Sequence, residues 1–326
     1  MKSKVKIIAA ANNFHFIDPL IPALSETFDI KKIESDLNLV SDSDLIWLEW
    51  ADGICIEILK QINSFPALLN KKIILRLHRY ELFSDRTIKA LSHLSQDVIN
   101  RIDKIVFVSK MVQEIGIDKF PWMENSVVIP NLIDHTKFPF YNREKGFNIL
   151  MLGRMSYVKN LPLALMAFYE LLQFNNNYKL HIVGNISDPE LIYYSVNFLE
   201  KTKIEKNVIF HGIIENEKLS EFMKNMHYIL SSSIFESQGM GILEAMCCGL
   251  KPAIFNFPGA DLIFPKDSNW LWTTINQFID RFLNSHYFPF AYHSFILDKF
   301  SIVENIYLYK NLIYNILNNE MSKKKI

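Results

Sequence analysis

One stretch of the sequence, residues 231–258, constrains the fold of this chain more than any other. It contains a loop with Gly239 and Gly241 that leads into an apolar segment with helical character. A strand-like run at 228–230 comes directly before it. The stretch itself then consists of three serines, the glycine loop, the apolar segment 242–248, Gly249, Pro252 and a strand-like run at 253–255. Gly249 stands where a helix C-terminus favours a residue with positive φ. The stretch therefore predicts a strand, a loop, a helix and a second strand, the repeating unit of an α/β fold.

Two carboxylates flank the expected start of that helix. Glu236 lies in the loop, and Glu244 follows eight residues later inside the helix. A helix N-terminus presents unpaired N–H groups and a partial positive charge, so it favours an anion such as phosphate. Because carboxylates repel phosphate, these two are better suited to accept hydrogen bonds from hydroxyls of a phosphate-bearing ligand, such as a nucleotide sugar. The simpler interpretation is an ordinary βαβ unit with a solvated Glu244 and glycines that only turn the chain.

The order of residues here resembles a known family. Residues 235–246, FESQGMGILEAM, followed by GLKP at 249–252, are similar to the Glu-x7-Glu signature of retaining GT-B glycosyltransferases of family 4, the glycosyl transferases group 1. The resemblance implies that Glu236 lies at the donor sugar and that Glu244 holds the nucleotide ribose. It also implies that the donor is bound at Gly239, Met240, Gly241 and Ile242.

A second motif lies further towards the N-terminus. Gly153-Arg154 with Lys159 matches the Gly-Arg…Lys motif of that family, whose two cations hold the donor diphosphate. Departure of a nucleoside diphosphate develops negative charge on its oxygens, and fixed cations stabilise that charge in the transition state. Taken alone, Arg154 and Lys159 are better interpreted as surface residues at the start of a helix, and the later signature is what favours the functional interpretation.

Three further residues stand where the family binds the nucleotide base. Gly184 ends one expected strand, and the turn after the next expected strand contains Gly212 and Ile213. Single glycines at strand ends are also common in ordinary turns, so this interpretation rests on the resemblance.

Apolar strands alternate with helices along the chain, which predicts parallel sheets covered on both faces. In the first half we expect strands at 4–11, 29–34, 45–50, 71–77, 105–108 and 127–129, with helices at 18–28, 52–62, 84–101 and 109–117. In the second half we expect strands at 147–152, 179–183, 208–210, 228–230 and 253–255, with helices at 160–174, 189–200, 218–224, 242–248 and 288–319.

The fold class is therefore α/β. The resemblance implies a GT-B fold: two doubly wound, Rossmann-like domains that face a cleft, with a C-terminal helix that crosses back to the first domain. We expect an N-terminal acceptor-side domain at 1–140 plus 301–326, and a nucleotide-sugar-binding domain at 147–300. Residues 134–146 are the expected linker. Eight of the ten glycines lie at or after Gly146, which favours the second domain as the nucleotide site, because close backbone approach to a ligand needs glycine.

The first domain departs from the family pattern. The family usually has a glycine-rich loop after the first strand, whereas residues 9–15 read AAANNFH and contain no glycine. His78, at the end of the strand 71–77, occupies a place where the family often has a histidine near the sugar. The other interpretation is a buried histidine with a structural role.

Composition narrows the function further. The formal net charge is zero, so no overall field attracts nucleic acid. No apolar run approaches the ~20 residues that span a bilayer, and the start of the chain reads as a strand rather than a signal peptide. The three cysteines have no disulfide or metal spacing, which favours the cytoplasm. The acidic pair most easily mistaken for a metal site, Asp42 and Asp44, precedes a strand, at the end of the sheet away from the ligand edge.

The resemblance implies a retaining glycosyltransferase that needs no metal or other cofactor. Arg154, Lys159, Glu236 and His78 are its expected catalytic residues. It would move a sugar from a UDP- or GDP-sugar to a glycan, glycolipid or protein acceptor in bacterial cell-surface polysaccharide or glycoconjugate synthesis. The protein would work in the cytoplasm, with membrane contact through the first domain left open. The alternatives are a non-catalytic nucleotide-sugar-binding or scaffold subunit of the same fold, and a nucleotide-sugar epimerase.

Overall fold

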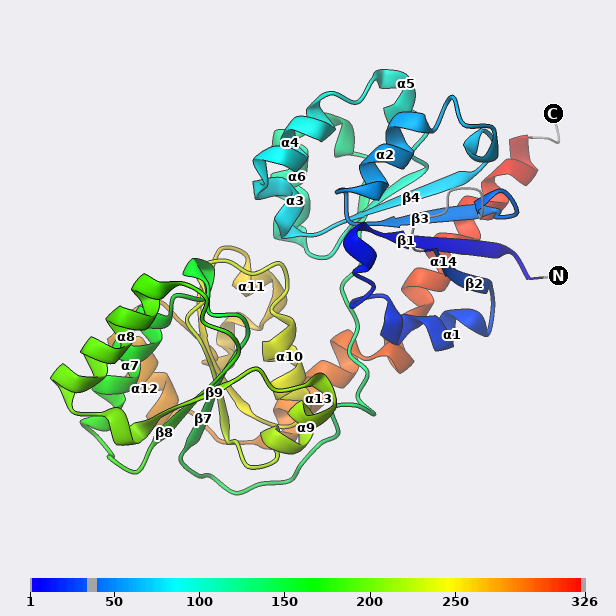
Figure 1. Cartoon of the computed structure of the whole chain (residues 1–326). Coiled ribbons are helices and arrows are strands. Elements are labelled where there is room, and N and C mark those ends of the chain that lie inside the picture. The colour runs from blue at the N-terminus through cyan, green and yellow to red at the C-terminus, as the bar shows by residue number, and fades with distance from the viewer. Residues whose placement is uncertain (1, 34–39, 324–326) are drawn as a thin grey trace. The chain divides into compact units, whose positions relative to one another are not determined.

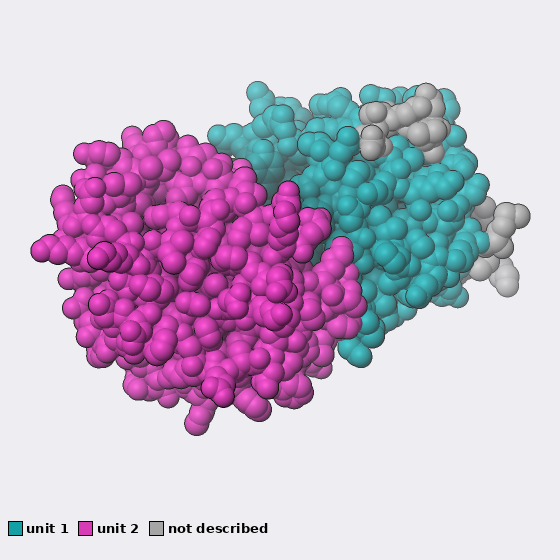
Figure 2. All heavy atoms as spheres, turned by 60° about the horizontal axis from the view of Figure 1, so that its bottom comes forward, with its two compact units in different colours: residues 1–132, 302–326 teal, residues 133–301 magenta. Residues whose placement is uncertain are grey.

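The chain forms two compact units in a computed structural model that describes residues 2–33 and 40–323. The first unit comprises residues 1–132 and 302–326, and the second comprises residues 133–301. Figure 2 colours the atoms of each unit separately. Each unit has its own six-stranded sheet in which every neighbouring pair of strands is parallel. The two sheets and their helices agree with the α/β, doubly wound architecture that the sequence predicts.

In the first unit the strand order is β2-β1-β3-β4-β5-β6 (Figure 1). The strands are β1 Lys4–Ala9, β2 Asp29–Ile33, β3 Leu45–Glu49, β4 Lys72–Leu77, β5 Lys104–Phe107 and β6 Ser126–Val128. The helices are α1 Ile21–Ser25, α2 Ile54–Gln61, α3 Arg79–Phe83, α4 Asp85–Ser92, α5 Gln96–Ile99, α6 Lys110–Lys119 and α14 Ile302–Lys323. The order reverses between β1 and β3, so connections leave these neighbours in opposite directions and open a crevice at their carboxyl ends.

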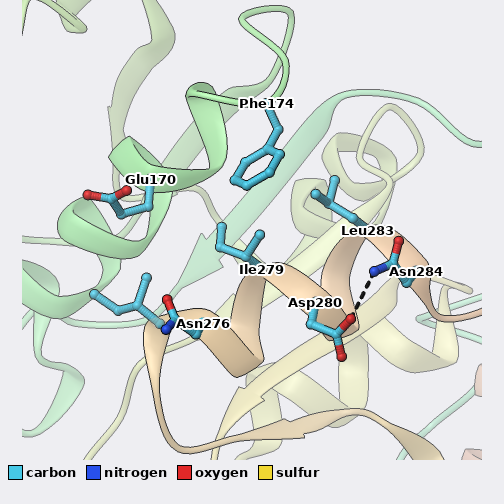
Figure 3. Close-up of a pocket in the computed structure, with 8 residues that line it drawn as sticks. Glu170, Phe174, Asn276, Ile279, Asp280, Leu283 and Asn284 are labelled. Atoms are coloured by element: carbon cyan, nitrogen blue, oxygen red, sulfur yellow. Dashed lines mark hydrogen bonds between the residues drawn. The ribbon is translucent and has the colours of Figure 1, made fainter.

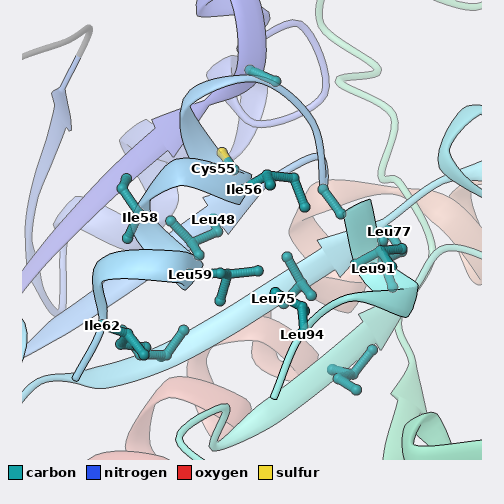
Figure 4. Packing of buried hydrophobic residues seen from close by; sticks show 14 of the residues in the cluster. Leu48, Cys55, Ile56, Ile58, Leu59, Ile62, Leu75, Leu77, Leu91 and Leu94 are labelled. Atoms are coloured by element: carbon teal, nitrogen blue, oxygen red, sulfur yellow. The ribbon is translucent and has the colours of Figure 1, made fainter. Parts of the chain in front are cut away.

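In the first unit, successive side chains of a strand point to opposite faces of the sheet, so the hydrophobic core has one part on each face. On β3, Ile46 and Leu48 join a cluster with α2, whereas Trp47 points to the opposite face and stacks on Tyr309 of α14. Figure 4 shows the α2 side, where Leu48 and Leu75 pack against residues of α2. Because successive strand side chains point to opposite faces, a strand buried on both sides reads as a continuous apolar run.

In the second unit the strand order is β12-β11-β10-β7-β8-β9. The strands are β7 Asn148–Leu152, β8 Lys179–Val183, β9 Val208–Gly212, β10 Tyr228–Ser231, β11 Lys251–Phe255 and β12 Leu271–Trp272. The helices are α7 Leu161–Leu172, α8 Pro189–Thr202, α9 Asn216–Met223, α10 Met240–Cys247, α11 Ala260–Ile263, α12 Ile275–Asn284 and α13 Pro289–Phe300. Numbered within the unit, the order is that of dinucleotide-binding folds, and it reverses between β7 and β10.

The sequence prediction of one helix over 288–319 is wrong. The chain forms α13 and α14, separated at Ser301, which is buried and pairs with Ile133 in an isolated bridge. The Ile133 N–H also donates to the Phe300 carbonyl over 2.7 Å. A long-range backbone pairing therefore ends α13, and α14 belongs to the first unit, which agrees with the expected helix that crosses back.

Other differences are local. The region 84–101 forms α4 and α5 rather than one helix, and the expected helix 18–28 is a 3-10 turn followed by the five residues of α1. The first strand ends at Ala9 rather than residue 11, because a 3-10 turn follows it. The sequence analysis did not predict α11, β12 or α12. Residue 34, the end of the expected strand 29–34, lies outside the described residues.

The expected linker 134–146 has no helix or strand but is fastened to the second unit. Arg143 donates to the carbonyls of Met223 and Cys248, at 2.9 and 2.6 Å, and the Tyr141 N–H also donates to Cys248. Residues 133–140, which we assigned to the first domain, are therefore part of the second unit.

Candidate active site

The site of interest in the second unit lies at the carboxyl ends of β7 and β10, where the strand order reverses. The loop after β7 leaves through Gly153, whose φ is 127°, and a Cβ there would lie 2.9 Å from Cε of Lys159. Gly184 follows β8 with φ 135°, and a Cβ there would lie 2.0 Å from the carbonyl oxygen of Gly153. Gly184 is thus required where the two loops touch, whatever it contributes to a ligand.

The two cations of the β7–α7 loop have different surroundings. Arg154 is exposed, and its side chain makes no hydrogen bond or ion pair with any residue in 2–33 or 40–323. Lys159 ends a short 3-10 helix, Tyr157–Lys159. Asn160 follows with a left-handed backbone conformation and directly precedes α7. The Lys159 side chain is only 22% exposed, and its Nζ lies 2.6 Å from Oε1 of Glu236.

Glu236 therefore meets Lys159, a residue 77 positions away in the sequence. Its side chain is 15% exposed, and Oε1 also accepts a hydrogen bond of 2.7 Å from the Ser233 hydroxyl. The other oxygen, Oε2, has no partner within the described part of the chain. The structure thus brings together the first glutamate of the signature and the lysine of the Gly-Arg…Lys motif.

Helix α10 begins beside this ion pair. Gly239 precedes it with φ 79°, and the carbonyl of Gly239 accepts the N–H groups of Ile242 and Leu243. No side chain caps the helix, and the N–H groups of Met240 and Gly241 have no acceptor among the residues described. A Cβ on Gly241 would lie 3.0 Å from Leu152, so this glycine lets the helix start pack against the end of β7. Unpaired N–H groups so placed favour an anion.

Glu244 lies in the second turn of α10 and is half-buried. Burial raises the pKa of Glu244 to about 7, against the opposing attraction of the Lys159 charge. Its carboxyl group has no hydrogen-bond partner in residues 2–33 and 40–323. A half-buried carboxyl without a protein partner is costly, which makes it a candidate to bind a ligand hydroxyl.

The expected base-binding residues lie on the neighbouring strands. The Gly184 N–H donates to the Gly212 carbonyl over 2.7 Å, which joins the ends of β8 and β9. Gly212 has φ 65°, and a Cβ there would meet no atom within 4 Å, while Ile213 is 76% exposed. These residues share the carboxyl edge of the sheet with Gly153 and leave open space next to it.

His78 has a different setting in the first unit. It ends β4 as expected, but it is 2% exposed, and its Nε2 lies 2.7 Å from Oε1 of Glu49. The indole of Trp50 stacks on its ring with centroids 3.9 Å apart. Burial lowers the pKa of His78, although its hydrogen bond to Glu49 acts in the opposite direction.

The sequence analysis missed the buried ion pair beside His78. Arg76 and Glu49 are both fully buried, occupy matched positions on β4 and β3, and are 2.7 Å apart. Arg76 also donates to the Tyr309 hydroxyl over 2.9 Å. The only signal in the sequence was one acid and one base in two apolar strands, and the sheet register is what places them side by side.

The loop after β1 has the backbone of a glycine loop without its glycines. Ala11 and Asn12 have φ values of 52° and 55°, and Trp50, after β3, has φ 72°. Such values are unfavourable for residues with a Cβ, particularly alanine and tryptophan. The sequence alone gave no indication of this strain.

A separate hollow of about 820 Å³ lies between α7 and α12 (Figure 3). Phe174 of the α7 side faces Ile279 and Leu283 of α12 across it, and Asn284 donates to Asp280 over 2.8 Å at its rim. None of the predicted site residues lines it.

Among the described residues, no three His, Cys, Asp or Glu side chains form a cluster that could hold a metal ion. Within the same part of the chain, each helix is too short or too polar to cross a bilayer.

Comparison with known proteins finds a family match for one segment of the chain. Residues 133–278 match the family model described as glycosyl transferases group 1. The match covers less than half of the chain, and we call this stretch the glycosyl transferases group 1 segment. The glycosyl transferases group 1 segment covers the second unit from the expected linker to α12, and it includes both motifs of the candidate site.

Curated relatives of the glycosyl transferases group 1 segment match over part of their length. The chain is 28% identical over 159 residues to an alpha-monoglucosyldiacylglycerol synthase of Streptococcus pneumoniae, covering 48% of this chain and 34% of that protein. It is 27% identical over 143 residues to one of the subunits of the human phosphatidylinositol N-acetylglucosaminyltransferase, covering 43% and 29%. The matches thus span about a third of the length of these two relatives.

Solved structures share the fold over most of the chain. HepE from Anabaena, in complex with UDP and glucose, has a TM-score of 0.76 at 14% identity, with 96% of this chain and all of that chain covered. A mutant of TarM from S. aureus, in complex with fondaparinux, alpha-GlcNAc-glycerol and UDP, has a TM-score of 0.65 at 20% identity, with 85% and 56% covered. At these identities the likeness shows the fold, which is GT-B.

Proposed function

We propose that the protein is a retaining glycosyltransferase whose second unit binds a nucleoside-diphosphate sugar. The observation that carries this proposal is the meeting of Lys159 and Glu236 beside the uncapped start of α10, with the unpaired Arg154 in the same loop. Cations and free amides suit the diphosphate, and carboxylates suit sugar hydroxyls. The family match of this segment and the UDP-bound neighbours support the same ligand class.

Each residue then has a role. Arg154 and Lys159 hold the diphosphate, and Glu236 with the amides of Met240 and Gly241 binds the sugar. Glu244 accepts hydrogen bonds from the ribose. Gly184, Gly212 and Ile213 border the base, and Gly153, Gly239 and Ile242 shape the loops around the donor.

The reaction needs no enzymatic nucleophile. The bond from the sugar anomeric carbon to the diphosphate oxygen breaks, and the acceptor hydroxyl oxygen forms the new bond on the same face. The acceptor proton passes to an oxygen of the departing diphosphate. Arg154 and Lys159 stabilise the charge that develops on that leaving group, which lowers the barrier. We propose that these two cations take the place of a divalent metal ion.

The donor and acceptor are proposed by class. Both neighbour structures were solved with UDP, which favours a UDP-sugar over a GDP-sugar. The relatives are named for transfer to diacylglycerol- and phosphatidylinositol-type lipids, and TarM was solved with saccharide and glycerol ligands. A glycan, glycolipid or protein acceptor, made for the cell surface from the cytoplasmic side of a membrane, fits this range.

Thermal unfolding with a panel of nucleotide sugars tests the proposal. A ligand that binds only the folded state raises stability by about 2.7 kcal/mol at 100 times its Kd. We expect UDP and at least one UDP-sugar to raise the Tm, and the same sugar nucleotide to release UDP slowly without an acceptor. Binding without any release of UDP would instead indicate a scaffold subunit, and no binding of any UDP- or GDP-sugar would contradict the proposal.

A further inference from the structure

Three consecutive serines lie at the end of strand β10 and directly after it, and each hydroxyl has a partner. Ser231, Ser232 and Ser233 are 6%, 0% and 1% exposed, so none of them is a surface residue. The Ser231 hydroxyl donates to Ser233 Oγ over 3.3 Å. They lie between β10 and the loop of Glu236, and the roles proposed above leave them unused.

Ser232 binds the backbone that carries Lys159. Its hydroxyl lies 2.8 Å from the carbonyl oxygen of Lys159 and 3.0 Å from that of Asn160. The N–H of Ile234 donates to the Val158 carbonyl over 2.8 Å. The end of β10 is thus joined to the 3-10 turn at three carbonyl groups, which fixes the position from which the Lys159 side chain extends.

Ser233 binds the partner of Lys159. Its hydroxyl donates to Oε1 of Glu236 over 2.7 Å, and the same oxygen receives Lys159 Nζ at 2.6 Å. Because Ser231 donates to Ser233, the Ser233 proton is directed at the carboxylate. One carboxylate oxygen is therefore held by a cation on a long side chain and by a buried hydroxyl just beyond the end of β10.

These two bonds respond differently to a bound diphosphate. A diphosphate attracts Lys159, since its charge exceeds that of one carboxylate. The Ser233 hydroxyl is neutral and buried just beyond the end of β10, so a bound diphosphate does not draw it away from Glu236. If Lys159 alone oriented Glu236, the carboxylate would lose its orientation at the moment when the donor binds.

We propose that Ser233 is a positioning residue that keeps Glu236 directed at the donor sugar after Lys159 turns to the diphosphate. The proposal rests on the proposed function, because it assigns Glu236 to the sugar and Lys159 to the diphosphate. Ser231 orients the Ser233 hydroxyl, and Ser232 fixes the Lys159 backbone. Loss of the Ser233 hydroxyl then weakens steps that involve the sugar and leaves nucleotide binding intact.

The test compares Ser233→Ala with Ser233→Thr, which keeps a hydroxyl. The matched control is Ser195→Ala, since Ser195 is 2% exposed and its hydroxyl donates to the Leu191 carbonyl within α8. For each variant we would measure the Kd of UDP by calorimetry. The release of UDP would be followed with whichever of UDP-glucose, UDP-galactose and UDP-GlcNAc the unmodified protein cleaves fastest.

We expect Ser233→Ala to lower kcat about tenfold, which corresponds to one lost hydrogen bond. The Kd of UDP should stay within twofold, and Ser195→Ala and Ser233→Thr should stay within threefold of the unmodified protein in kcat. In a Glu236→Gln background, Ser233→Ala should change kcat by less than twofold, because a residue that acts through Glu236 is not additive with it.

Two results would overturn the proposal and leave the proposed function intact. One is an unchanged kcat in Ser233→Ala, and the other is a full tenfold loss that persists in the Glu236→Gln background. If the unmodified protein binds and cleaves none of these three donors and no other UDP- or GDP-sugar, the proposed function fails first, and the role of Ser233 falls with it.

Discussion

Each unit contains a partly or fully buried glutamate paired with a cation at the carboxyl ends of its strands, and the two pairs differ in burial and in unused hydrogen-bonding capacity. Glu49 and Arg76 are fully buried, and Glu49 Oε2 also accepts the Trp47 indole N–H over 3.0 Å. Burial acts to raise the pKa of Glu49, but the Arg76 charge, together with the hydrogen bonds from His78 and Trp47, outweighs burial and lowers that pKa. Lys159 and Glu236 are partly exposed, and one oxygen of Glu236 has no partner among the described residues.

The difference separates a structural pair from a functional one. The Glu49 and Arg76 pair is part of a closed network that reaches Tyr309 of α14, so a ligand could enter only by breaking the core. Lys159 and Glu236 can exchange partners, because solvent and ligand reach both. Unused hydrogen-bonding capacity on a fixed side chain is thus the better sign of a binding site than the presence of an ion pair.

The largest expected effect comes from breaking the buried pair. Arg76→Ala leaves Glu49 charged and buried without its main partner, so we expect a loss of about 3–5 kcal/mol in the free energy of unfolding. Urea unfolding followed by circular dichroism measures this loss. Arg86→Ala is the control, because Arg86 is 72% exposed and pairs with Asp52 at the surface, where such pairs contribute about 0–1 kcal/mol. Equal losses in the two variants would contradict the distinction.

The next effect falls on activity. Arg154→Ala removes a cation that faces the proposed leaving group, so we expect turnover of the preferred donor to fall about 10²-fold or more. Lys159→Ala should act in the same direction. Arg281→Ala in α12 is the control, since Arg281 lies on another helix and is not one of the site residues. Unmodified turnover in a folded Arg154→Ala protein would remove Arg154 from the site.

The sequence predicted the charged residues of the pair in the second unit and missed the buried pair in the first unit. Arg154, Lys159, Glu236 and Glu244 lie in short motifs with fixed spacing, so the sequence alone is enough to propose them as site residues. The pairing of Glu49 with Arg76 depends on the register between β3 and β4, which no local pattern specifies. The end of α13 at Ser301 depends on Ile133, 168 residues earlier, and helical periodicity cannot detect such a partner.

The first unit also contains a turn with backbone angles that favour glycine, although its residues are not glycines. The family glycines are missing after β1, yet Ala11 and Asn12 have the positive φ values that glycine favours. Sequence reasoning uses glycine as the sign of such a turn, so it had no basis for predicting one here. β12 has only two residues, too few to show alternation.

A smaller effect on stability is expected at Glu244, whose carboxyl group has no partner among the described residues, in contrast to the paired carboxylate of Glu49. Because the pKa of Glu244 is raised to about 7, the folded state keeps a proton that the unfolded chain releases above its ordinary pKa. The stability contributed by this group is therefore present at low pH and lost as the pH rises through about 7. Glu244→Gln should stabilise the protein at pH 8 by about 1 kcal/mol and have less effect at pH 5. Urea unfolding at both pH values measures the difference, and a loss of stability at pH 8 would contradict it.

The same variant separates the two glutamates of the signature. Glu244→Gln weakens the proposed hydrogen bonds to ribose, so it should mainly raise the Kd of UDP. Glu236→Gln should mainly lower kcat, because its proposed partner is the reacting sugar. Swapped or identical effects on Kd and kcat would contradict the assigned roles.

The smallest expected effect concerns metal ions and the acidic pair that precedes β3. Asp42 pairs with Lys4 and Lys6, both at 3.2 Å, and Asp44 accepts the Lys4 N–H over 2.7 Å. Both aspartates thus lie at the amino ends of β1 and β3, as their position in the sequence predicts. The hydrogen bond from Lys6, and to a smaller extent that from Lys4, lowers the pKa of Asp42. In a parallel α/β sheet ligands bind outside the carboxyl ends, so these carboxylates cannot hold a metal ion for the donor. We expect turnover to survive excess chelator, and Asp42→Asn with Asp44→Asn to leave it within twofold, because Arg154 and Lys159 supply the positive charge. Loss of transfer in chelator, restored by manganese, would contradict the proposed metal independence. It would also mean that movement of Lys159 from Glu236 to the diphosphate does not supply enough positive charge for catalysis.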